Sequence, residues 1–423
     1  MVIINTSSLP LAGRFFAPAV DLISSCPSFR SCPVLSDDAW VRLGITRALE
    51  DKPSGRAFLQ EISAVIDDVP ARSSFFESLA SVRRLCLCRE VNDGLRTRMS
   101  RTLTDPLAAF PALRDFAVFA GDGHFHAAAV HDPRDPDGTT YATGHLYMLD
   151  LRSHAAHHLD AGDKEHRKKE HDMRTLKRQT PAALRCGTPA GRKVILVWDR
   201  AGIDFHQWRL WKETSGIYFI SRPKENMNLA KQGDCEYDRT APVNTGILAD
   251  EMVAPATHMR MIRRITFINP ARGESWQVLT NEVTLPPGLV VKLYLMRWDI
   301  EKMFDEFKNK IMERKSWASS VTAKCMQAVF LCLTHNLMIL QEEILHREHG
   351  LTNEAEDRRR AKRLADEKQD ITKASRTISP LRETLQRCTQ RSVKFIRWLR
   401  SYLFGEAPWG RMLAALRKAY QTS

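Results

Sequence analysis

The sequence lacks a long hydrophobic run. No stretch reaches the roughly 18 consecutive apolar residues that a membrane-spanning helix requires, and no basic segment precedes an apolar run at the N-terminus. We therefore expect neither a membrane span nor a signal peptide, and we expect a cytoplasmic protein. The sequence also lacks a P-loop and a glycine-rich dinucleotide fingerprint, so it predicts no nucleotide cofactor.

The cysteines lack the pattern of a disulfide framework or a zinc site. There are nine, an odd number, and none forms a paired CxxC motif, which is typical of reduced thiols in a cytosol. The Cys86-Leu-Cys88 pair is a weak metal signal, and two small buried residues on a helix explain it equally well. Several histidines also lack a ligand spacing with cysteines, which favours solvated or strand-edge positions over zinc: His124, His126, His154, His157, His158, His166 and His171.

Acidic residues are few relative to basic ones. Lys and Arg number 63 against 50 Asp and Glu, which gives a net charge of +13 and a pI near 9.4. Residues 351–423 alone hold 17 basic and 8 acidic residues. An excess of this kind favours a polyanionic partner, because each phosphate that Lys or Arg neutralises releases a counterion. A merely basic soluble protein is the alternative.

The length of 423 residues exceeds one compact core and predicts two to four domains. An apolar fraction of 43% is ordinary for a globular chain. Residues 1–105 predict a helical N-terminal region, because residues 36–102 show an apolar stripe near helical period decorated by Arg83, Arg84 and Arg89. This region either recognises DNA ends or is a helical bracket for the core.

The period changes near residue 106. Phe116 to Asp122 is a buried strand pattern that ends in a carboxylate, and residues 194–198 (VILVW) form a second that delivers Asp199. Further strands are expected at 141–151, 154–159 and 217–221, with a helix at 203–213. In chain order, three strands, a charged helix-like segment at 163–183, a strand, the helix and a last strand predict an α/β core over residues 106–221.

A second change follows at residue 222. Residues 222–287 contain short strand-like runs, such as 261–268 and 276–280, separated by Gly, Pro and Asn. They predict a β-rich insertion. Residues 288–345 return to a helical pattern, and residues 346–423 predict a basic helical C-terminal region.

One helical segment carries a polar stripe. On a helix of about 100° per residue with Glu301 at zero, Tyr294 falls near +20°, Arg297 near −40° and Lys308 near −20°. Apolar residues such as Ile300, Met303 and Phe304 fall on a neighbouring face that would pack on a core. The stripe places one carboxylate beside two cations and a phenol at a groove edge. An ordinary surface pair of Arg297 and Glu301 is the plainer interpretation.

The spacing Y-x2-R-x3-E-x6-K in this segment resembles the signature helix of the insertion-sequence-4 family of DDE transposases. Residues 194–202 (VILVWDRAG) resemble the strand that ends in the second catalytic aspartate of that family. Residues 117–123 (AVFAGDG) resemble the strand that carries the first, and Leu279-Thr-Asn281 resembles the strand before the helix. The resemblance covers about residues 110 to 340.

This resemblance implies an RNase H-like core interrupted by a β-rich insertion. It implies three catalytic carboxylates, Asp122, Asp199 and Glu301, that bind the metal. Cleavage of a phosphodiester needs a positioned nucleophile and a stabilised leaving oxygen, which two Mg²⁺ ions about 4 Å apart can serve. Mg²⁺ prefers oxygen ligands, and Mn²⁺ can substitute. The separation of 102 positions from Asp199 to Glu301 suits an insertion.

The resemblance also implies contacts with DNA. Arg297 and Lys308 would bind flanking phosphates, and Tyr294 would donate to one. In such transposases a DNA hairpin frees the flanking strand end, and an aromatic residue of the insertion stacks on a flipped base. Trp276 is the candidate for that role and Trp298 its competitor. The expected partners are double-stranded DNA, as the element's own inverted repeats and as target, and a second copy in the synaptic complex.

Two rival carboxylates and two rival functions remain. Asp150 also ends a predicted strand, and Asp204 lies close to Asp199 in the sequence. Asp122 and Asp199 are favoured over these rivals, because each has a predicted strand before it and small residues nearby. A structure-specific endonuclease on the same core, or a silent DNA-binding derivative, are the alternatives to a transposase of the bacterial nucleoid. Joining of a cleaved 3′ end to target DNA distinguishes a transposase from the endonuclease.

Overall fold

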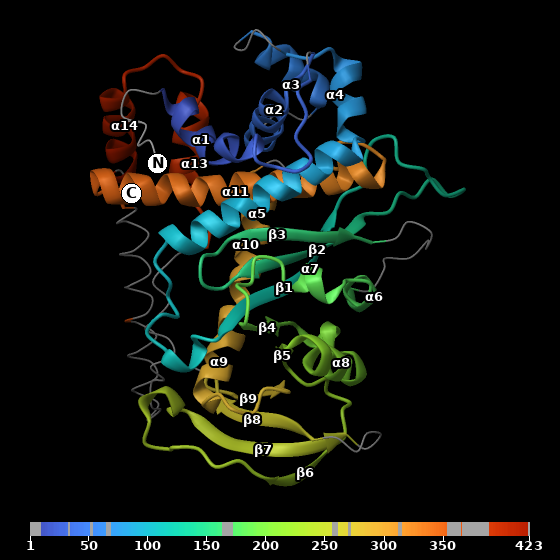
Figure 1. The fold of residues 1–423 in the computed structure, drawn as a ribbon, viewed down its shortest axis with the longest axis vertical. Helices are drawn as coiled ribbons and strands as arrows, with labels where there is room; N and C mark the ends of the chain where they lie inside the picture. Colours follow the sequence, from blue (N-terminus) through green and yellow to red (C-terminus); the bar gives the residue numbers. More distant parts are fainter. Residues whose placement is uncertain are drawn as a thin grey trace.

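The computed structural model describes most of the chain. The described residues are 10–32, 34–50, 54–64, 69–162, 172–255, 261–269, 272–311, 315–352, 365 and 389–421. His166, His171 and a large part of the expected basic C-terminal region lie outside them. The fold is mixed α/β, with one large sheet and helices on both of its faces (Figure 1).

Nine described strands form one sheet in the order β3-β2-β1-β4-β5-β9-β8-β7-β6. The first three are antiparallel neighbours, and β4 and β5 run parallel to β1. An antiparallel pairing of β5 with β9 then joins the antiparallel strands β6 to β9. The strands are β1 (Phe116–His126), β2 (Thr143–Asp150), β3 (Ala156–Ala161), β4 (Lys193–Val197), β5 (Ile217–Ser221), β6 (Leu229–Asp234), β7 (Ile247–Pro255), β8 (Ile262–Ile268) and β9 (Ser275–Thr280).

The strands predicted from the sequence lie within a few residues of these bounds. The run VILV at residues 194–197 is continuously apolar because both faces of β4 are covered: Ile195 and Val197 pack in one apolar cluster, and Val194 and Leu196 pack in the other. Residues 222–287 contain β6 to β9, so the expected β-rich character is present there. These strands extend the central sheet through the β5–β9 pairing.

Three of the described helices cover one face of the sheet. They are α6 (Asp172–Lys177), α7 (Pro181–Leu184) and α8 (Phe205–Ser215). Trp208 and Trp211 of α8 pack with Trp198 and Phe219 in one apolar cluster on this face. The helix begins at Asp204, whose side chain accepts from the Gln207 N–H, and ends at Gly216 in the left-handed conformation.

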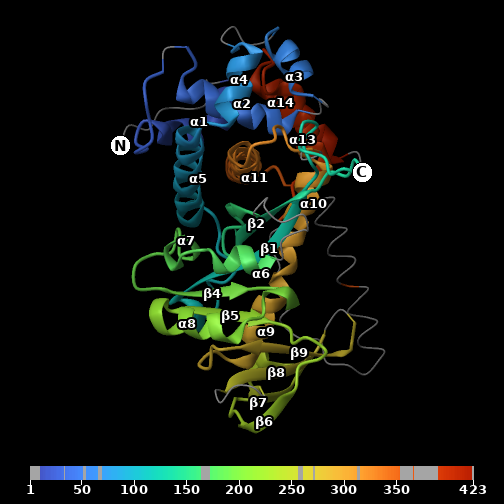
Figure 2. The ribbon, with the colours of Figure 1, turned by 90° about the vertical axis from the view of Figure 1, so that its right-hand side faces the viewer.

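Four other described helices lie on the opposite face. They are α5 (Val82–Thr102), α9 (Pro287–Met296), α10 (Trp298–Asn309) and α11 (Val321–His349). Their apolar side chains share one core with Val118, Ala120 and Tyr147 of the sheet. Figure 2 shows α11 end-on, with α5 and α10 on either side of it and the sheet below.

The remaining described helices lie beyond α11, on the side away from the sheet (Figures 1 and 2). They are α1 (Leu11–Ile23), α2 (Asp37–Leu49), α3 (Gly55–Ile62), α4 (Arg72–Leu79), α13 (Val393–Tyr402) and α14 (Trp409–Gln421), and short 3-10 turns lie at Pro111–Leu113, Arg200–Gly202 and Pro242–Asn244. Among the described residues, one helix, α11, is long enough and apolar enough to cross a membrane. Its most apolar 18-residue segment is, however, entirely buried in the protein. Its covering by helices and sheet identifies it as a core helix.

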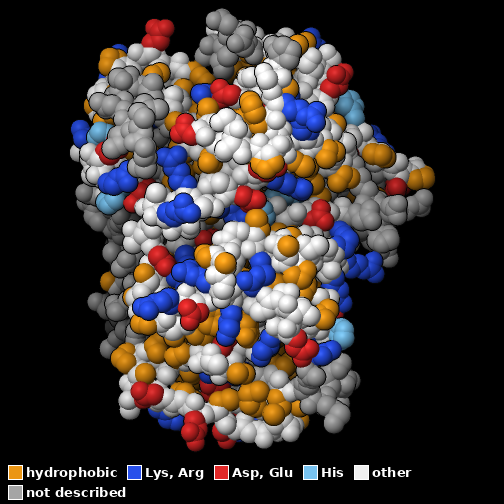
Figure 3. Space-filling view, in the orientation of Figure 1, with side chains coloured by type: hydrophobic (Ala, Val, Ile, Leu, Met, Phe, Trp, Pro, Cys, Tyr) orange, Lys and Arg blue, Asp and Glu red, His pale blue; other side chains and the backbone are white. Residues whose placement is uncertain are grey.

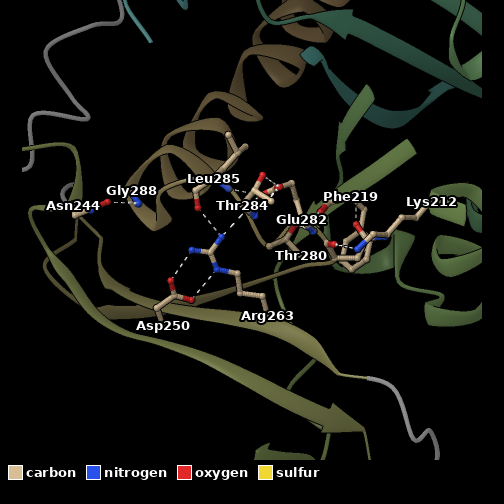
Figure 4. A network of polar contacts seen from close by, with 11 residues as sticks. Lys212, Phe219, Asn244, Asp250, Arg263, Thr280, Glu282, Thr284, Leu285 and Gly288 are labelled. Carbon is tan, nitrogen blue, oxygen red and sulfur yellow. Dashed lines mark hydrogen bonds and ion pairs between the residues drawn. The ribbon is translucent and has the colours of Figure 1, made fainter. Parts of the chain in front are cut away.

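A polar network joins β6–β9 to the start of α9 (Figure 4). Arg263 of β8 donates to both oxygens of Asp250 at 2.8 and 2.6 Å and to the Leu285 carbonyl at 2.7 Å. Glu282 accepts from the Thr284 and Leu285 N–H groups. Asp250, Arg263 and Glu282 are buried, so their polar groups depend on partners within the protein. The network fixes the direction in which α9 leaves the sheet.

Candidate active site

Asp122 and Asp199 lie side by side on two inner strands of the sheet. Asp199 follows the end of β4, whereas β1 continues to His126, so Asp122 lies within its strand and not at the strand end that the sequence predicted. In the parallel pairing of β1 with β4, Ala120 is opposite Val197. Asp122 and Asp199 each follow these residues by two positions, so the register brings them level on adjacent strands. Side chains two residues apart on a strand point to the same face. Both carboxylates therefore face the side of the sheet where α9 and α10 lie.

Close packing fixes the backbone around the two aspartates. Gly121 lies against the Trp198 ring, and a Cβ at Gly121 would come within 2.3 Å of it. The Asp199 side chain accepts from the Ala201 N–H at 2.8 Å and so begins the turn Arg200–Gly202. Ser221 of β5 donates to the Asp199 carbonyl at 2.7 Å. The two aspartates are held by packing and by hydrogen bonds of neighbouring strands.

Glu301 reaches the site on α10. The sequence predicted a single helix through Tyr294 and Lys308. The structure instead has two helices, α9 and α10, with the single residue Arg297 between them. The Arg297 and Ile300 N–H groups bond to carbonyls three residues earlier rather than four. This local tightening ends α9 and begins α10 without leaving the helical conformation.

Aromatic packing docks α10 on the sheet. Phe304 stacks on His124 of β1 with ring centroids 4.5 Å apart, and it contacts Tyr147 of β2 at 5.5 Å. Phe307 contacts Tyr147 at 5.8 Å. Because Glu301 lies one turn before Phe304, this packing sets the position of its carboxylate. The predicted apolar face of the segment is confirmed, since Ile300, Met303, Phe304 and Phe307 are all buried.

Arg297 connects the carboxylates of strand and helix. Its Nη1 lies 3.2 Å from Oδ2 of Asp122, and its Nη2 lies 2.6 Å from Oε1 of Glu301. Burial alone would lower the pKa of the guanidinium, but the Asp122 and Glu301 carboxylates raise it above its ordinary value. One cationic group therefore lies between two of the three predicted carboxylates.

Tyr294 of α9 lies beside Arg297. Its ring is only 8% exposed, so it is not part of an open polar stripe as the sequence suggested. Burial raises the pKa of its hydroxyl, while the neighbouring Arg297 and Arg222 guanidiniums act to lower it and Asp199 acts to raise it. Tyr294 is thus within electrostatic reach of both arginines and of Asp199. Lys308, in contrast, is exposed near the end of α10.

The two tryptophans differ in their surroundings. Trp276 of β9 is half-buried, with the Arg222 guanidinium 3.9 Å and the Arg272 guanidinium 5.7 Å from its ring centroid. Phe267 meets it edge-on at 6.5 Å. Trp298 is 57% exposed at the start of α10. Arg222, which follows β5, was not identified from the sequence; its position after a buried strand was the available signal.

The rival carboxylates have structural roles. Asp150 accepts from the Arg152 N–H and the Ser153 hydroxyl, which shapes the β2–β3 turn. Asp204 caps α8 and contacts Lys177. The histidines expected to be solvated or at strand edges are buried wherever the structure describes them: His124, His126, His154, His157 and His158. His126 and His158 cluster with His145 and Tyr147. Burial is the first cause that lowers the pKa of His126 and His158 well below its usual range.

The three carboxylates are not drawn to one point. In the part of the chain that the structure describes, they do not form a group whose ligand oxygens all lie within 4.8 Å of one another. Arg297 instead separates Asp122 from Glu301. The donor atoms of all three side chains are hard carboxylate oxygens, the type of ligand that Mg²⁺ and Mn²⁺ prefer. The residues present therefore fit such ions, and the position of Arg297 shows that the carboxylates stabilise a positive charge between them.

Comparisons with known proteins add the following. Residues 122–337, just over half of the chain, match the family model described as transposase DDE domain. A solved structure with some similarity is described as the cryo-EM structure of a piggyBac transposase synaptic complex with hairpin DNA. The two chains share 12% identity, the match covers 99% of this chain and 86% of that one, and the TM-score is 0.37. No curated protein matches the chain.

Proposed function

This chain belongs to the transposase DDE domain family, and on that premise we propose that it cleaves DNA at the inverted-repeat ends of an insertion sequence and joins the cleaved ends to target DNA. Members of the family are in general DNA-cleaving and transesterifying enzymes that use divalent metal ions. The observation that carries the proposal is the position of Asp122 and Asp199 level on adjacent strands, with Arg297 between Asp122 and Glu301.

Within the family we place the chain in the insertion-sequence-4 group, because residues 294–308 contain Y-x2-R-x3-E-x6-K. The core is RNase H-like, comprising residues 106–221 and 288–345. Support comes from the strand order β3-β2-β1-β4-β5, with three antiparallel strands followed by two parallel ones. Residues 222–287 are the insertion, and residues 1–105 and 346–423 are the flanking regions.

Asp122, Asp199 and Glu301 would hold the metal, most suitably two Mg²⁺ ions, with Mn²⁺ as a substitute. When bound, such ions activate the attacking oxygen and stabilise the leaving oxygen of an in-line displacement. The protein supplies the first carboxylate from within β1, the second from just after β4, and the third from a docked helix. Arg297 holds Asp122 and Glu301 in place until substrate and metal arrive, and it then contacts a phosphate near the cleaved bond.

The groups around the carboxylates would bind DNA. Tyr294 donates its hydroxyl to a phosphate, since burial keeps it protonated. Lys308, exposed on α10, contacts a phosphate further along the duplex. Trp276 receives a flipped base during hairpin formation, with Trp298 as the competitor for that role. A base that stacks on Trp276 must share the ring with Arg222 or displace it, because the guanidinium already covers one face.

The proposed partners are double-stranded DNA and a second copy of the chain, which together form the synaptic complex at the nucleoid of a bacterial cytoplasm. The net charge of +13 supports a polyanionic partner. Figure 3 shows Lys and Arg side chains more numerous across the middle of one face, over the sheet, than over the helices above it. Salt should weaken binding steeply, because phosphate contacts release counterions.

The test uses the purified chain, Mg²⁺ and DNA that carries the ends flanking its own gene. We expect cleavage followed by strand transfer. Asp122→Asn, Asp199→Asn and Glu301→Gln should each reduce cleavage on the order of 10³-fold or more while end binding is retained. Ca²⁺ should support binding without chemistry. Asp305→Asn, an exposed carboxylate one turn beyond Glu301, is the matched control and should cleave normally.

Each outcome has a defined meaning. Full cleavage by one of the three variants removes that residue from the site. Cleavage without any joining of the 3′ end to target DNA favours the structure-specific endonuclease. Binding without cleavage in the wild-type chain favours a silent DNA-binding derivative.

A further inference from the structure

Three side chains that the proposed function does not use converge beneath α5. They are Asp93 of α5, His157 of β3 and Cys186, two residues beyond α7. Their ligand atoms all lie within 4.8 Å of one another. Nδ1 of His157 is 3.5 Å from Oδ1 of Asp93. The three residues thus join segments far apart in the sequence.

The His157 ring is the second, independent observation. The residue is 8% exposed, and its Nδ1 is buried without a hydrogen bond in the structure. A buried polar atom of this kind costs free energy unless something satisfies it. The atom faces the Asp93 carboxylate at a distance that is too long for a hydrogen bond but ordinary for two ligands of one ion. In a tetrahedral zinc site, ligand atoms about 2.0 to 2.3 Å from the metal lie roughly 3.3 to 3.8 Å apart.

The donor set selects the kind of ion. A thiolate, an imidazole and a carboxylate are ligands that suit Zn²⁺ and related borderline ions, whereas Mg²⁺ prefers oxygen alone. A Cys186 thiolate and the Asp93 carboxylate would together balance the charge of a divalent ion. Asp93 and Cys186 are partly exposed, which leaves a path for the ion and a fourth position for water.

Arg96 supports this arrangement from behind. Its Nη1 donates to Oδ1 of Asp93 at 2.9 Å and to Sγ of Cys186 at 3.5 Å, and its Nη2 donates to the Cys186 carbonyl at 2.9 Å. Groups that hydrogen-bond to ligands commonly orient them around a metal. Carboxylate and thiolate each retain lone pairs for an ion while they accept from Arg96. The guanidinium also limits the affinity, because it is a cation beside a cation.

We propose that Asp93, His157 and Cys186 form a binding site for a zinc-class divalent ion, separate from the carboxylates within β1 and just after β4. The ion would join α5, the edge strand β3 and the segment that leads into β4. It would therefore have a structural role, since it would tie the N-terminal helices to the sheet edge. The search for this ion requires no assumption about DNA cleavage.

The test uses the full-length chain and the metal alone. The protein is freed of metal with a zinc-selective chelator and titrated with Co²⁺, whose absorption reports its ligands. We expect a thiolate-to-cobalt charge-transfer band that saturates at one ion per chain and disappears when Zn²⁺ is added. Cys186→Ser should abolish the band. Cys86→Ser, a half-buried cysteine on α5 outside the cluster, is the matched control and should retain it.

Two further variants protect the test against a folding defect. Asp93→Asn alters a partly exposed side chain and keeps the thiol, and His157→Gln keeps the thiol and removes the imidazole; both should weaken Zn²⁺ binding at least tenfold. Thermal melts of the metal-free variants verify that they fold. A folded wild-type chain without a charge-transfer band overturns the proposal. A band that persists unchanged in Cys186→Ser also overturns it, because another cysteine then binds the ion.

Discussion

Arg297 is the residue through which the strand and helix carboxylates meet. It bonds to Asp122 at 3.2 Å and to Glu301 at 2.6 Å. Its positive charge offsets the repulsion that these neighbouring carboxylates would otherwise exert on one another. The sequence placed Arg297 on a stripe with Glu301 by helical spacing, and the i, i+4 contact is present. The contact with Asp122 spans 175 residues and has no local signal, so no spacing argument could have predicted it.

The guanidinium fork matters for this contact, because it spans two carboxylates at once. In Arg297→Lys the charge remains but a single ammonium cannot reach both groups with the same geometry. We expect single-turnover cleavage to slow on the order of 10²-fold, with end binding nearly unchanged, and Arg297→Gln to be slower still. Cleavage by Arg297→Lys at the wild-type rate would show that charge alone is sufficient. Rates are measured on DNA that carries the element's own ends.

Gly121 offers a test of how packing positions the aspartates. A Cβ there would lie 2.3 Å from the Trp198 ring, and Trp198 immediately precedes Asp199. Gly121→Ala should therefore destabilise the fold by about 1–3 kcal/mol and also slow cleavage, since the ring must shift. Gly233→Ala, in a strand position where a Cβ meets nothing within 4 Å, is the control. A Gly121→Ala protein with the stability and activity of Gly233→Ala would contradict the argument.

At the scale of elements, the sequence predicted the strands and helices whose positions depend on a local pattern of residues. The strands at 116–122, 194–198 and 217–221 were found because a buried strand is a short apolar run with turn signals at its ends. The pairing of β5 with β9 and the turn at Arg297 were not predicted. The β5–β9 pairing is a long-range contact that no local pattern encodes. The turn at Arg297 leaves the helical conformation in place and changes only the carbonyl to which each N–H group donates. The convergence of His157 with Cys186 escaped for the same reason, since 29 residues separate them without a ligand motif.

The strands β6 to β9 carry Trp276, and its role is the prediction at this scale. If its ring receives a flipped base, Trp276→Ala should still nick the element end but accumulate nicks in place of hairpins. Base–aromatic stacking is worth about 1–3 kcal/mol, so hairpin yield should fall at least several-fold. Trp298→Ala is the comparison, because that ring is exposed at the start of α10. Wild-type hairpin yield from a folded Trp276→Ala protein would assign the role elsewhere, and a selective defect in Trp298→Ala would move it there.

At the scale of the whole molecule, the N-terminal helices share a core with the rest of the chain. Side chains from α1, α2 and α5 pack in one apolar cluster with α11, α13 and α14. Two of the arginines thought to face DNA are engaged within the protein: Arg83 pairs with Asp37, and Arg84 is buried and donates to the Leu35 carbonyl. Recognition of DNA ends by residues 36–102 stays a prediction. It is best tested by substitution of exposed residues, because removal of residues 1–105 would strip the cover from α11.

The stability of the whole chain should depend on pH through His145. Its ring faces His124, His126 and His158 from the neighbouring strands and Lys324 from α11, and its Nδ1 lies 3.0 Å from Nε2 of His158. Burial, with His124 and Lys324, lowers the pKa of His145 to about 3. The unfolded chain binds a proton here below about pH 6.5 that the folded chain excludes until about pH 3. The contribution of His145 is therefore full above about pH 6.5 and declines as the pH falls.

His145→Asn tests this sign, because asparagine keeps a polar group near the position of Nδ1 but does not titrate. Each pH unit below the unfolded pKa should cost the wild-type chain about 1.4 kcal/mol through this residue. Between pH 7.5 and pH 5.0 the wild-type chain should thus lose ~2 kcal/mol more than the variant, even if the variant is less stable at pH 7.5. Urea unfolding at several pH values measures the difference. Parallel pH dependences would mean that the ring accepts a proton in the folded chain, and the buried cluster would then tolerate charge in a way that its packing does not predict.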